Sequence, residues 1–544
     1  MKKTILAALL FLPLFVRAEI KLPAVFTDHL VLQRDLAVPV WGWAKVGEEV
    51  TVEFAEQKKT VKTDANGQWR VKLDPLVASS QPREMKIGSR VIKDVLVGEV
   101  WLASGQSNMG FPVGSAHHAE QALAKAGDPL LRFFTVQNAT AAEPQDDHRG
   151  RWDASTPDTA KSFSAVAYFF ARDLRAKLGV PVAILHSSWG GTPAQAWLSM
   201  EALRESPAFE NYTKIYEAAL EKHRHVLAKP EMMTKYREDL AQWQKQIAPP
   251  FNDAMKAWNA GPKTTPKPLP ARPEPANPDP MDVPSPSSRP GTPSVIFNAK
   301  IAPLAGYAMR GALWYQGEAN ASGGIEYRTL LPRLIGDWRK RWAQGDFPFL
   351  IVQLSSWDMD SKPAPQHHWP VLREAQARTA SSVPNCALAV SIDVGDPKDV
   401  HPKGKEPVGQ RLALAARKLV YGEVSLVASG PVFREAKADG AMMRVRFNEV
   451  GGGLIIGQAP WRALSDAQWP QDRLVGFVLA GEDSQWHDAE ARIEGDSILV
   501  TSAAVAKPVA VRYAWANSPR CNLYNREGLP AVPFRSDDWP MPKK

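Results

Sequence analysis

A serine at position 107 has the sequence context of an exposed nucleophile. Residues 95–103 form an apolar run that predicts a buried strand, and Gly105-Gln-Ser107-Asn follows its end. A serine on a tight, glycine-bearing turn at the carboxyl end of a central strand can present its hydroxyl at the sheet edge. Met109 occupies the place of the second glycine in a Gly-x-Ser-x-Gly elbow, which disfavours the α/β-hydrolase fold. The alternative is a serine that only caps the following turn.

A histidine beside a carboxylate offers the base that such a serine needs. His401 lies in Asp396-Pro-Lys-Asp399-Val-His401, after the last predicted strand and before a predicted helix. This position places it on the same sheet edge as Ser107. Asp399 is the expected orienting acid, with Asp396 and Asp393 as reserves, and a Ser–His dyad is a further option. The Asp-x-His spacing is weak evidence by itself because it occurs often by chance.

Two loops between these segments are expected to donate hydrogen bonds to an oxyanion. Residues 187–192, Ser-Ser-Trp-Gly-Gly-Thr, include Gly191, whose backbone N–H is unobstructed by a side chain. Residues 314–320, Trp-Tyr-Gln-Gly-Glu-Ala-Asn, offer the side-chain amides of Gln316 and Asn320. Glycines and amides are also common in ordinary strand-to-helix loops, which is the alternative interpretation.

A parallel sheet is the element expected to position these loops. Five apolar runs predict buried strands, at residues 95–103, 180–186, 311–315, 347–354 and 387–392. Amphipathic helices at 164–178 and 407–421 lie between or beyond them. Buried strands that alternate with helices predict a three-layer α/β/α domain over residues 95–422. The carboxyl ends of its strands share one edge, where Ser107 and His401 would meet.

Alternating patterns on both sides of this domain predict two further modules. Residues 19–94 and 423–544 contain short segments of alternating apolar and polar residues, as in a β-sandwich. The central domain is interrupted at about residues 200–293 by charged helical stretches and then a dense run of prolines. We expect this insertion to lie over the surface.

The N-terminus has the pattern of an export signal. Lys2 and Lys3 precede an apolar run at residues 5–16, and a small-residue cleavage pattern ends at Ala18. The run is shorter than the roughly 20 residues that span a bilayer. We therefore expect a signal peptide at residues 1–18 and an exported, periplasmic or secreted protein without membrane insertion.

The composition is typical of a globular protein. The chain is 44% hydrophobic and 23% charged, with a formal net charge of +8 spread along its length. No basic tract stands out, so we expect no nucleic-acid partner. Two cysteines, Cys386 and Cys521, form neither a disulfide framework nor a metal-binding cluster, although export would permit them to pair.

Four motifs, taken in order, resemble one family of hydrolases. Gly-Gln-Ser-Asn-Met at 105–109, the 187–192 and 314–320 loops, and Asp-Val-His-Pro at 399–402 resemble the sialate O-acetylesterase family of SGNH-type hydrolases. The resemblance runs from about residue 22 to residue 540 and covers both β modules. It implies an SGNH-like central domain and hydrolysis of O-acetyl esters on sugars, with no metal or organic cofactor.

The resemblance also assigns roles to individual residues. They are the nucleophile Ser107, the general base His401, and the oxyanion donors Gly191, Gln316 and Asn320 together with the backbone N–H of Ser107. One departure puts the third member of the triad in doubt. SGNH enzymes commonly place the acid three residues before the histidine, and here that place is Lys398. Asp399 lies two residues before it and is the expected acid.

The expected substrates are O-acetylated sugars. Tryptophans in or near the predicted edge are candidate platforms for sugar rings, at Trp189, Trp314, Trp357 and Trp369. Sialic acids are the first substrate class, and acetylated xylan or another plant polysaccharide is the alternative on the same fold. A non-catalytic carbohydrate-binding protein is the alternative of another class. The sugar, the oligomeric state and any protein partner stay open.

Overall fold

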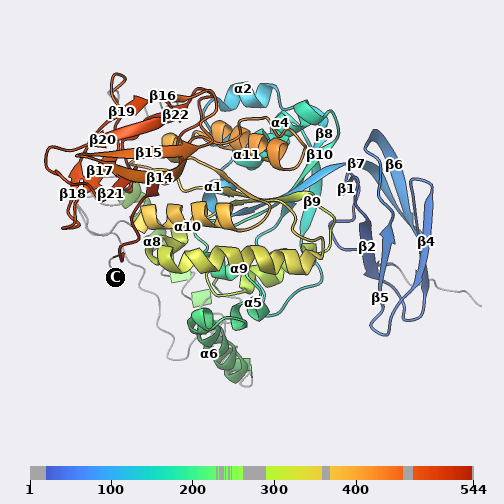
Figure 1. The fold of residues 1–544 in the computed structure, drawn as a ribbon. Coiled ribbons are helices and arrows are strands. Elements are labelled where there is room, and N and C mark those ends of the chain that lie inside the picture. The colour runs from blue at the N-terminus through green and yellow to red at the C-terminus, as the bar shows by residue number, and fades with distance from the viewer. Residues whose placement is uncertain are drawn as a thin grey trace, which may run out of the picture.

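The computed structural model of the chain describes residues 20–541 with several gaps (Figure 1). The gaps lie at 228–230, at scattered positions from 232 to 247, and at 261–288, 358–367 and 458–469. The expected signal peptide and nearly all of the proline-rich run therefore lie outside the described residues.

A largely parallel sheet forms the centre of the molecule, and the fold is mixed α/β. Its strands run in the order β13-β12-β11-β7-β10-β8-β9, and all neighbours pair in parallel except β8 and β9. The strands are β7 (Arg90–Gly105), β8 (Asp128–Val136), β9 (Gly150–Ser155), β10 (Val182–Ser188), β11 (Gly311–Tyr315), β12 (Phe349–Val352) and β13 (Cys386–Ala389). The sequence predicted all of these except β8 and β9.

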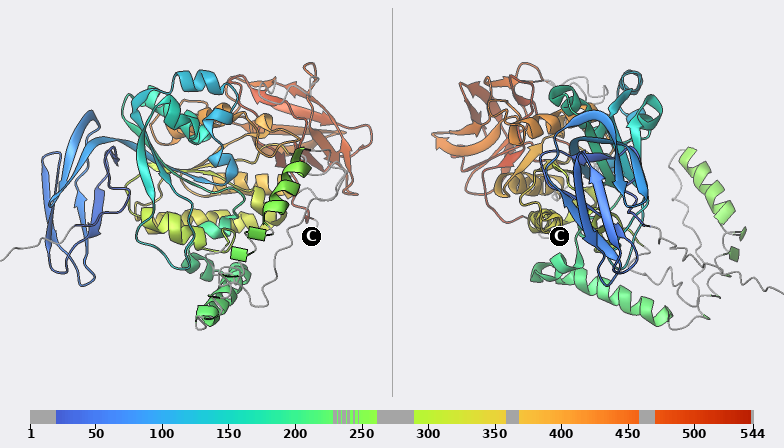
Figure 2. Two further views of the ribbon diagram at one scale, coloured as in Figure 1. Left: turned by 180° about the vertical axis from the view of Figure 1, so that it is seen from behind. Right: turned by 90° about the vertical axis from the view of Figure 1, so that its right-hand side faces the viewer.

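Helices cover both faces of this sheet (Figures 1 and 2). Alternate residues of β7 point to opposite faces, so Trp101 and Ala103 join one apolar core while Val100 and Leu102 join another. The helices that fill these cores are α4 (Ala165–Leu178) and α11 (Lys405–Leu419) on the first face, and α9 (Gly324–Trp342) and α10 (His368–Ser382) on the second.

Local sequence sets both ends of α4 and links it to the turn after β7. The Ser164 hydroxyl accepts a hydrogen bond from the Ala167 backbone N–H at 3.2 Å, which caps the first turn. Gly179 ends the helix with a φ of 68°. The Ser164 hydroxyl also donates to the Met109 carbonyl at 2.5 Å. The helix start therefore holds the segment that follows Ser107.

The N-terminal module consists of two small sheets that share apolar residues with the central domain. One contains β1 (Val31–Gln33), β3 (Glu49–Phe54), β4 (Gln57–Lys62), β6 (Ser79–Ile87) and the first half of β7, and the other pairs β2 (Val38–Trp43) with β5 (Gln68–Leu73). Strand β7 then continues into the central sheet without a break. The module and the nucleophile turn are thus joined by one strand.

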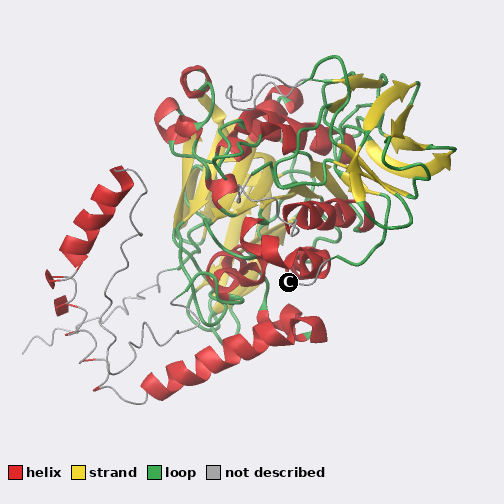
Figure 3. Cartoon of the chain, turned by 90° about the vertical axis from the view of Figure 1, so that its left-hand side faces the viewer, coloured by secondary structure: helices red, strands yellow, loops and turns green. Residues whose placement is uncertain are grey.

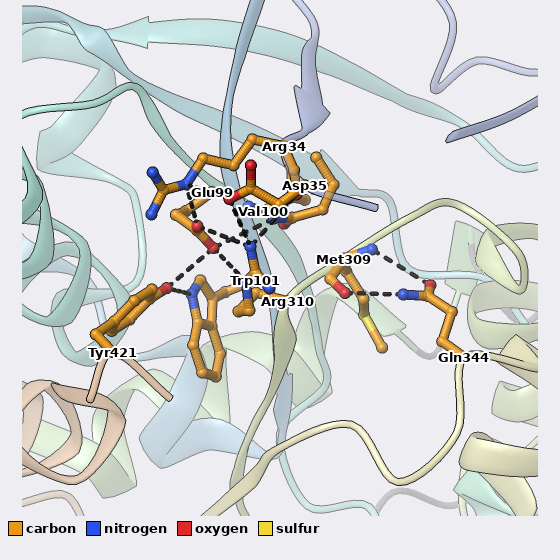
Figure 4. Close-up of polar contacts among 10 residues, drawn as sticks. Arg34, Asp35, Glu99, Val100, Trp101, Met309, Arg310, Gln344 and Tyr421 are labelled. Carbon is orange, nitrogen blue, oxygen red and sulfur yellow. Dashed lines mark hydrogen bonds and ion pairs between the residues drawn. The ribbon is translucent and has the colours of Figure 1, made fainter. Parts of the chain in front are cut away.

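A buried carboxylate fastens the N-terminal module to the base of the central sheet (Figure 4). Glu99 on β7 is fully buried and accepts hydrogen bonds from Arg34 at 2.5 Å and from Arg310 at 2.8 Å. The Tyr421 hydroxyl, which lies beyond α11, donates to it at 3.0 Å. Burial by itself would raise the pKa of the Glu99 carboxyl, but the two arginines outweigh burial and lower it.

The C-terminal module lies at the opposite end of the central domain (Figure 1). One antiparallel sheet contains β14 (Val432–Asp439), β15 (Met442–Asn448), β19 (Glu490–Glu494) and β20 (Ser497–Thr501). The other contains β17 (Phe477–Ala480), β18 (Trp486–Asp488), β21 (Ala510–Tyr513) and β23 (Phe534–Arg535), and β16 (Leu454–Ile456) pairs with β22 (Leu523–Asn525). Residues of all three sheets share one core. Arg373 of α10 ties the module in place, since it donates to the carbonyls of Ala516 and Asn517.

The described part of the insertion is helical. It contains α5 (Met200–Arg204), α6 (Glu210–Leu227) and α8 (Ala248–Ala260). Helix α6 projects from the body of the protein (Figures 1 and 3). Its first turns are anchored, because the Tyr212 hydroxyl donates to Glu326 of α9 at 2.7 Å.

Candidate active site

A glycine turn delivers Ser107 to the edge of the central sheet. Gly105 ends β7 with a φ of +133°, and a β-carbon there would lie 2.1 Å from the Tyr315 carbonyl oxygen of β11. Only glycine fits this approach. The next residue, Gln106, donates its backbone N–H to the same carbonyl at 3.0 Å. The short helix α1 (Ser107–Gly110) then begins at the serine itself.

The structure places Ser107 and His401 in direct contact. Ser107 Oγ and His401 Nε2 are 2.7 Å apart, although 294 positions separate them in the sequence. Asp399 contacts the histidine in a different way. Its Oδ1 accepts the His401 backbone N–H at 2.8 Å and lies 3.7 Å from His401 Nδ1. The carboxylate therefore fixes the loop by the main chain and approaches the ring only as a nearby charge.

The surroundings of His401 favour its neutral form. Partial burial lowers the pKa of the imidazole, and the positive charge of Lys405 lowers it further. The negative charge of Asp399 acts in the opposite direction and is the smaller effect. A histidine with a pKa below its ordinary value is unprotonated at neutral pH, which is the form that accepts a proton from a serine hydroxyl.

Asp393, a reserve for the acid, is turned away from the site. Its carboxylate is fully buried and forms two bonds with Arg411 of α11, at 2.6 and 2.7 Å. Asp393 as the third member of a triad is therefore wrong. The other reserve, Asp396, accepts the backbone N–H of Lys398 at 2.9 Å within its own turn.

The two predicted amide donors are used elsewhere. Gln316 is fully buried, and its Nε2 donates to the Thr192 carbonyl at 3.2 Å and to Asn320 Oδ1 at 2.8 Å. Both hydrogens of that amide are thus engaged, while Asn320 Nδ2 donates to Gln195 at 3.0 Å. Neither residue lines the cavity at Ser107. These side chains join the 187–192 and 314–320 loops instead of pointing at the nucleophile.

Of the two glycines in the 187–192 loop, Gly190 is the one that packs against Ser107. A β-carbon on it would lie 3.3 Å from the Ser107 β-carbon, whereas one on Gly191 would meet no atom within 4 Å. Gly191 has a φ of +72°. The backbone N–H of Ser107 is available to donate to an oxyanion, because the N–H groups in the first turn of a helix have no acceptor within the helix.

A cavity of about 520 Å³ opens beside Ser107 and His401. Its walls come from the ends of β7, β8 and β10, and include Phe111, Gln137, Asn138, His186, Ser188, Trp189 and Gly190.

Of the four tryptophans predicted to contact substrate, Trp189 lines this cavity. Trp314 is fully buried and donates to Tyr327, and Trp369 is buried and donates to the Ser355 carbonyl. Trp357 packs on Trp369 with ring centroids 5.2 Å apart. Trp314 and Trp369 as substrate platforms are therefore wrong.

Two polar residues of the cavity wall, Asn138 and His186, were not predicted as site residues from the sequence. Asn138 follows β8. The Nζ of Lys300 donates a hydrogen bond to Asn138 Oδ1 at 2.6 Å. Lys300 also donates to the Ser188 carbonyl at 3.0 Å, and burial lowers its pKa to about 7. His186 contacts Ser188 Oγ at 2.8 Å, and burial lowers its pKa to about 3. Recognising residues 128–136 as a strand would have placed Asn138 at this edge.

Three further features bear on the expectations. Cys386 and Cys521 are not joined in a disulfide. Within residues 20–541, as far as they are described, no three His, Cys, Asp or Glu side chains gather as metal ligands would. None of the described helices is both long and apolar enough to cross a bilayer.

Comparison with known proteins gives one consistent answer. Residues 294–418, which include His401, match the family of carbohydrate esterases described as sialic acid-specific acetylesterases. Sialate O-acetylesterase of the rat is 29% identical over 93% of this chain and 92% of its own, and the human enzyme is 27% identical over 93% and 90%. The crystal structure of a carbohydrate acetylesterase from Xanthomonas citri is 34% identical, with a TM-score of 0.75 over 96% of this chain and 100% of that one. The chain thus belongs to the sialic acid-specific acetylesterase family of carbohydrate esterases.

Proposed function

We propose that this esterase releases acetate from O-acetylated sugars with Ser107 as its nucleophile and His401 as its base. The observation that carries the proposal is the 2.7 Å contact between Ser107 Oγ and His401 Nε2 in the wall of the 520 Å³ cavity. A serine bonded to a neutral histidine is an activated nucleophile. The contact lies outside the carboxyl end of β7, where β10 and β11 flank it on opposite sides and ligands bind in open α/β sheets.

The reaction proceeds in two steps through an acetyl-enzyme. His401 Nε2 takes the hydroxyl proton as Ser107 Oγ attacks the acetyl carbonyl carbon, and the carbonyl oxygen becomes an oxyanion. Backbone N–H groups of Ser107 and of the Gly190–Gly191 pair donate to it. The C–O bond to the sugar breaks, and the departing sugar oxygen takes the proton from His401. Water then attacks the acetyl group by the same sequence and restores Ser107.

The third residue of the site has a limited part in this scheme. Asp399 stabilises the imidazolium through a charge 3.7 Å from Nδ1, with about half of its side chain exposed to water. It also holds the turn before His401 through the backbone bond. The catalytic unit is therefore closer to a Ser107–His401 dyad, assisted by Asp399, than to a tightly coupled triad.

The remaining expectations complete the proposal. The central domain, residues 95–422, is assigned to the SGNH type, and the modules at 19–94 and 423–544 are assigned as β-sandwiches. The chain is exported through a signal peptide at residues 1–18. Sialic acids are the first substrate class because four sialate O-acetylesterases are similar to the chain over 93% of its length.

One experiment tests both the chemistry and the substrate. Purified protein and its Ser107→Ala variant are offered O-acetylated sialic acid and acetylated xylo- and manno-oligosaccharides, and acetate release is measured. Release that is lost in the variant supports the proposal, and the preferred sugar assigns the substrate. Equal release by parent and variant would refute the role of Ser107.

A further inference from the structure

A cluster of three polar side chains, Asn108, Lys405 and the partly buried Glu318, lies beside the catalytic pair. Asn108 is fully buried, and Lys405, the first residue of α11, is 1% exposed. Lys405 Nζ donates to Asn108 Oδ1 at 2.5 Å. Asn108 Nδ2 donates in turn to Glu318 Oε1 at 2.6 Å and to the Val400 carbonyl at 2.9 Å. Every hydrogen-bonding atom of the Asn108 amide is therefore used.

The bond from Asn108 to Val400 joins the two halves of the catalytic pair. Asn108 follows Ser107 directly, and Val400 directly precedes His401. One side-chain bond between these neighbours therefore fixes the nucleophile turn against the loop that carries the base. An N–H···O hydrogen bond keeps its two heavy atoms about 2.7–3.2 Å apart, so this bond restricts how far the two loops can separate at this point.

Lys405 and Glu318 determine which way the Asn108 amide points. An ammonium group only donates hydrogen bonds, and a carboxylate only accepts them. The amide oxygen therefore faces Lys405 and the amide nitrogen faces Glu318. A flipped amide would point its NH₂ group at the ammonium and its oxygen at the carboxylate and the Val400 carbonyl. The two charged groups thus hold the one orientation in which Asn108 can bond to Val400.

Burying these charged groups is costly. Charged groups lose their hydration when buried, and the loss often exceeds the gain from pairing. Burial lowers the pKa of Lys405 to about 7 and raises that of Glu318. Glu318 Oε2 is buried and has no hydrogen-bond partner among the described residues. Lys405 also packs near the rings of Phe111 and Tyr315, so the competing explanation is ordinary packing.

We infer that Lys405 and Glu318 are positioning residues that act through Asn108 to hold His401 in hydrogen-bonding register with Ser107. The inference rests on the proposed function for its catalytic consequence. The charged groups that act on His401 are Lys405 from α11 and Asp399 from its own loop. Lys405 disfavours the imidazolium and Asp399 favours it.

The sign of the expected effect follows from these charges. Loss of the Lys405 charge raises the pKa of His401, because one of the effects that lower it is gone. The base then becomes protonated at a higher pH. The acid limb of the kcat/KM profile therefore moves to higher pH in Lys405→Met. Packing alone would lower activity or stability and leave the limb in place.

The variants are Lys405→Met, Glu318→Gln and the double variant, with Lys403→Met as the matched control. Lys403 is exposed and lies two residues before Lys405. Lys405→Met leaves a buried carboxylate without its cation, so its Tm should fall. The double variant removes both charges and should recover part of that loss. It therefore keeps the test valid even if the single variant unfolds.

Two readouts are taken from each folded variant. NMR titration of the His401 ring measures its pKa without any substrate, and acetate release gives kcat/KM against pH. We expect the pKa of His401 and the acid limb to rise in Lys405→Met and in the double variant, and kcat/KM to fall by about 10²-fold as the pair loses register. Lys403→Met should match the parent in both readouts.

The outcomes distinguish this inference from the proposed function. An unchanged His401 pKa in the folded double variant would overturn the inference, whether or not the parent hydrolyses acetyl esters. A shifted His401 pKa together with parent-like kcat/KM would overturn the positioning role. Activity that survives in Ser107→Ala would refute the proposed function instead and leave the NMR result standing on its own.

Discussion

The substitution Asp399→Asn tests how the third residue of the site contributes. Asparagine keeps an oxygen that can accept the His401 backbone N–H, which Asp399 now does at 2.8 Å, so the turn should be preserved. Only the negative charge is removed. That charge lies 3.7 Å from His401 Nδ1, beyond hydrogen-bonding distance, and 52% of the Asp399 side chain is exposed.

The size of the loss follows from this distance and exposure. Two unit charges about 4 Å apart interact by about 1 kcal/mol in water and by about 4 kcal/mol at an effective dielectric constant near 20. A half-exposed carboxylate lies toward the watery end of this range because solvent screens it. We therefore expect the imidazolium in the transition state to lose roughly 1 kcal/mol, which corresponds to a five- to tenfold fall in kcat/KM.

The assay is acetate release against pH by the parent, Asp399→Asn and Asp396→Asn. Asp399 raises the pKa of His401, so its loss should move the acid limb of kcat/KM to lower pH. Asp396→Asn is the matched control on the same turn and should behave like the parent. A fall of 10³-fold or more in Asp399→Asn, with Tm unchanged, would contradict the weak coupling of Asp399 to the His401 ring. It would show a tightly coupled triad, in which loss of the acid costs about 10⁴-fold.

Three further changes are expected to have distinct effects. Gly190→Ala should lower kcat at least tenfold with little change in Tm, because its β-carbon would press on Ser107 at 3.3 Å; parent-like kcat would contradict this. Trp189→Ala should raise KM roughly tenfold and spare kcat, since its ring lines the cavity; an unchanged KM would remove it from the sugar site. Glu99→Gln should lower the free energy of unfolding by about 3–5 kcal/mol at pH 7, because two arginines lose their buried partner. In the parent, this stabilisation is fully present above pH 4.5, the pKa of Glu99 in the unfolded chain. It is lost as the pH falls through the lower pKa that Glu99 has in the folded protein. Denaturant titrations at several pH values would measure this loss.

The sequence predicted the parts of the fold that bury uninterrupted apolar runs. Such runs predicted β7, β10, β11, β12 and β13. The carboxyl ends of these strands placed Ser107 and His401 on one edge of the sheet. Strand β8 was missed because Arg132 interrupts its apolar run. Arg132 is buried and pairs with Asp94 at 2.8 Å, so a distant residue makes that position tolerable. A partner of this kind cannot be read from local pattern.

Side-chain orientation was the least predictable property of the site. Gln316 and Trp314 were expected to face substrate, but every residue of β11 is buried, so no polar alternation marks its faces. Gln316 turns to the Thr192 carbonyl, a partner from a loop far away in the sequence. The buried Lys300 and Lys405 were missed for a related reason. Lysine is almost never fully buried, and only the fold shows the groups that pair with it.

The most direct test of the proposed mechanism is to look for an acetyl group on Ser107. The enzyme is mixed with an acetylated substrate, quenched in acid within the first turnovers and digested, and the peptide that contains Ser107 is examined by mass spectrometry. The proposed mechanism predicts one acetyl group on Ser107, which is absent from an identical experiment with Ser107→Ala. Substrate turnover without any acetyl-enzyme, or with acetyl on a different residue of the chain, would contradict it.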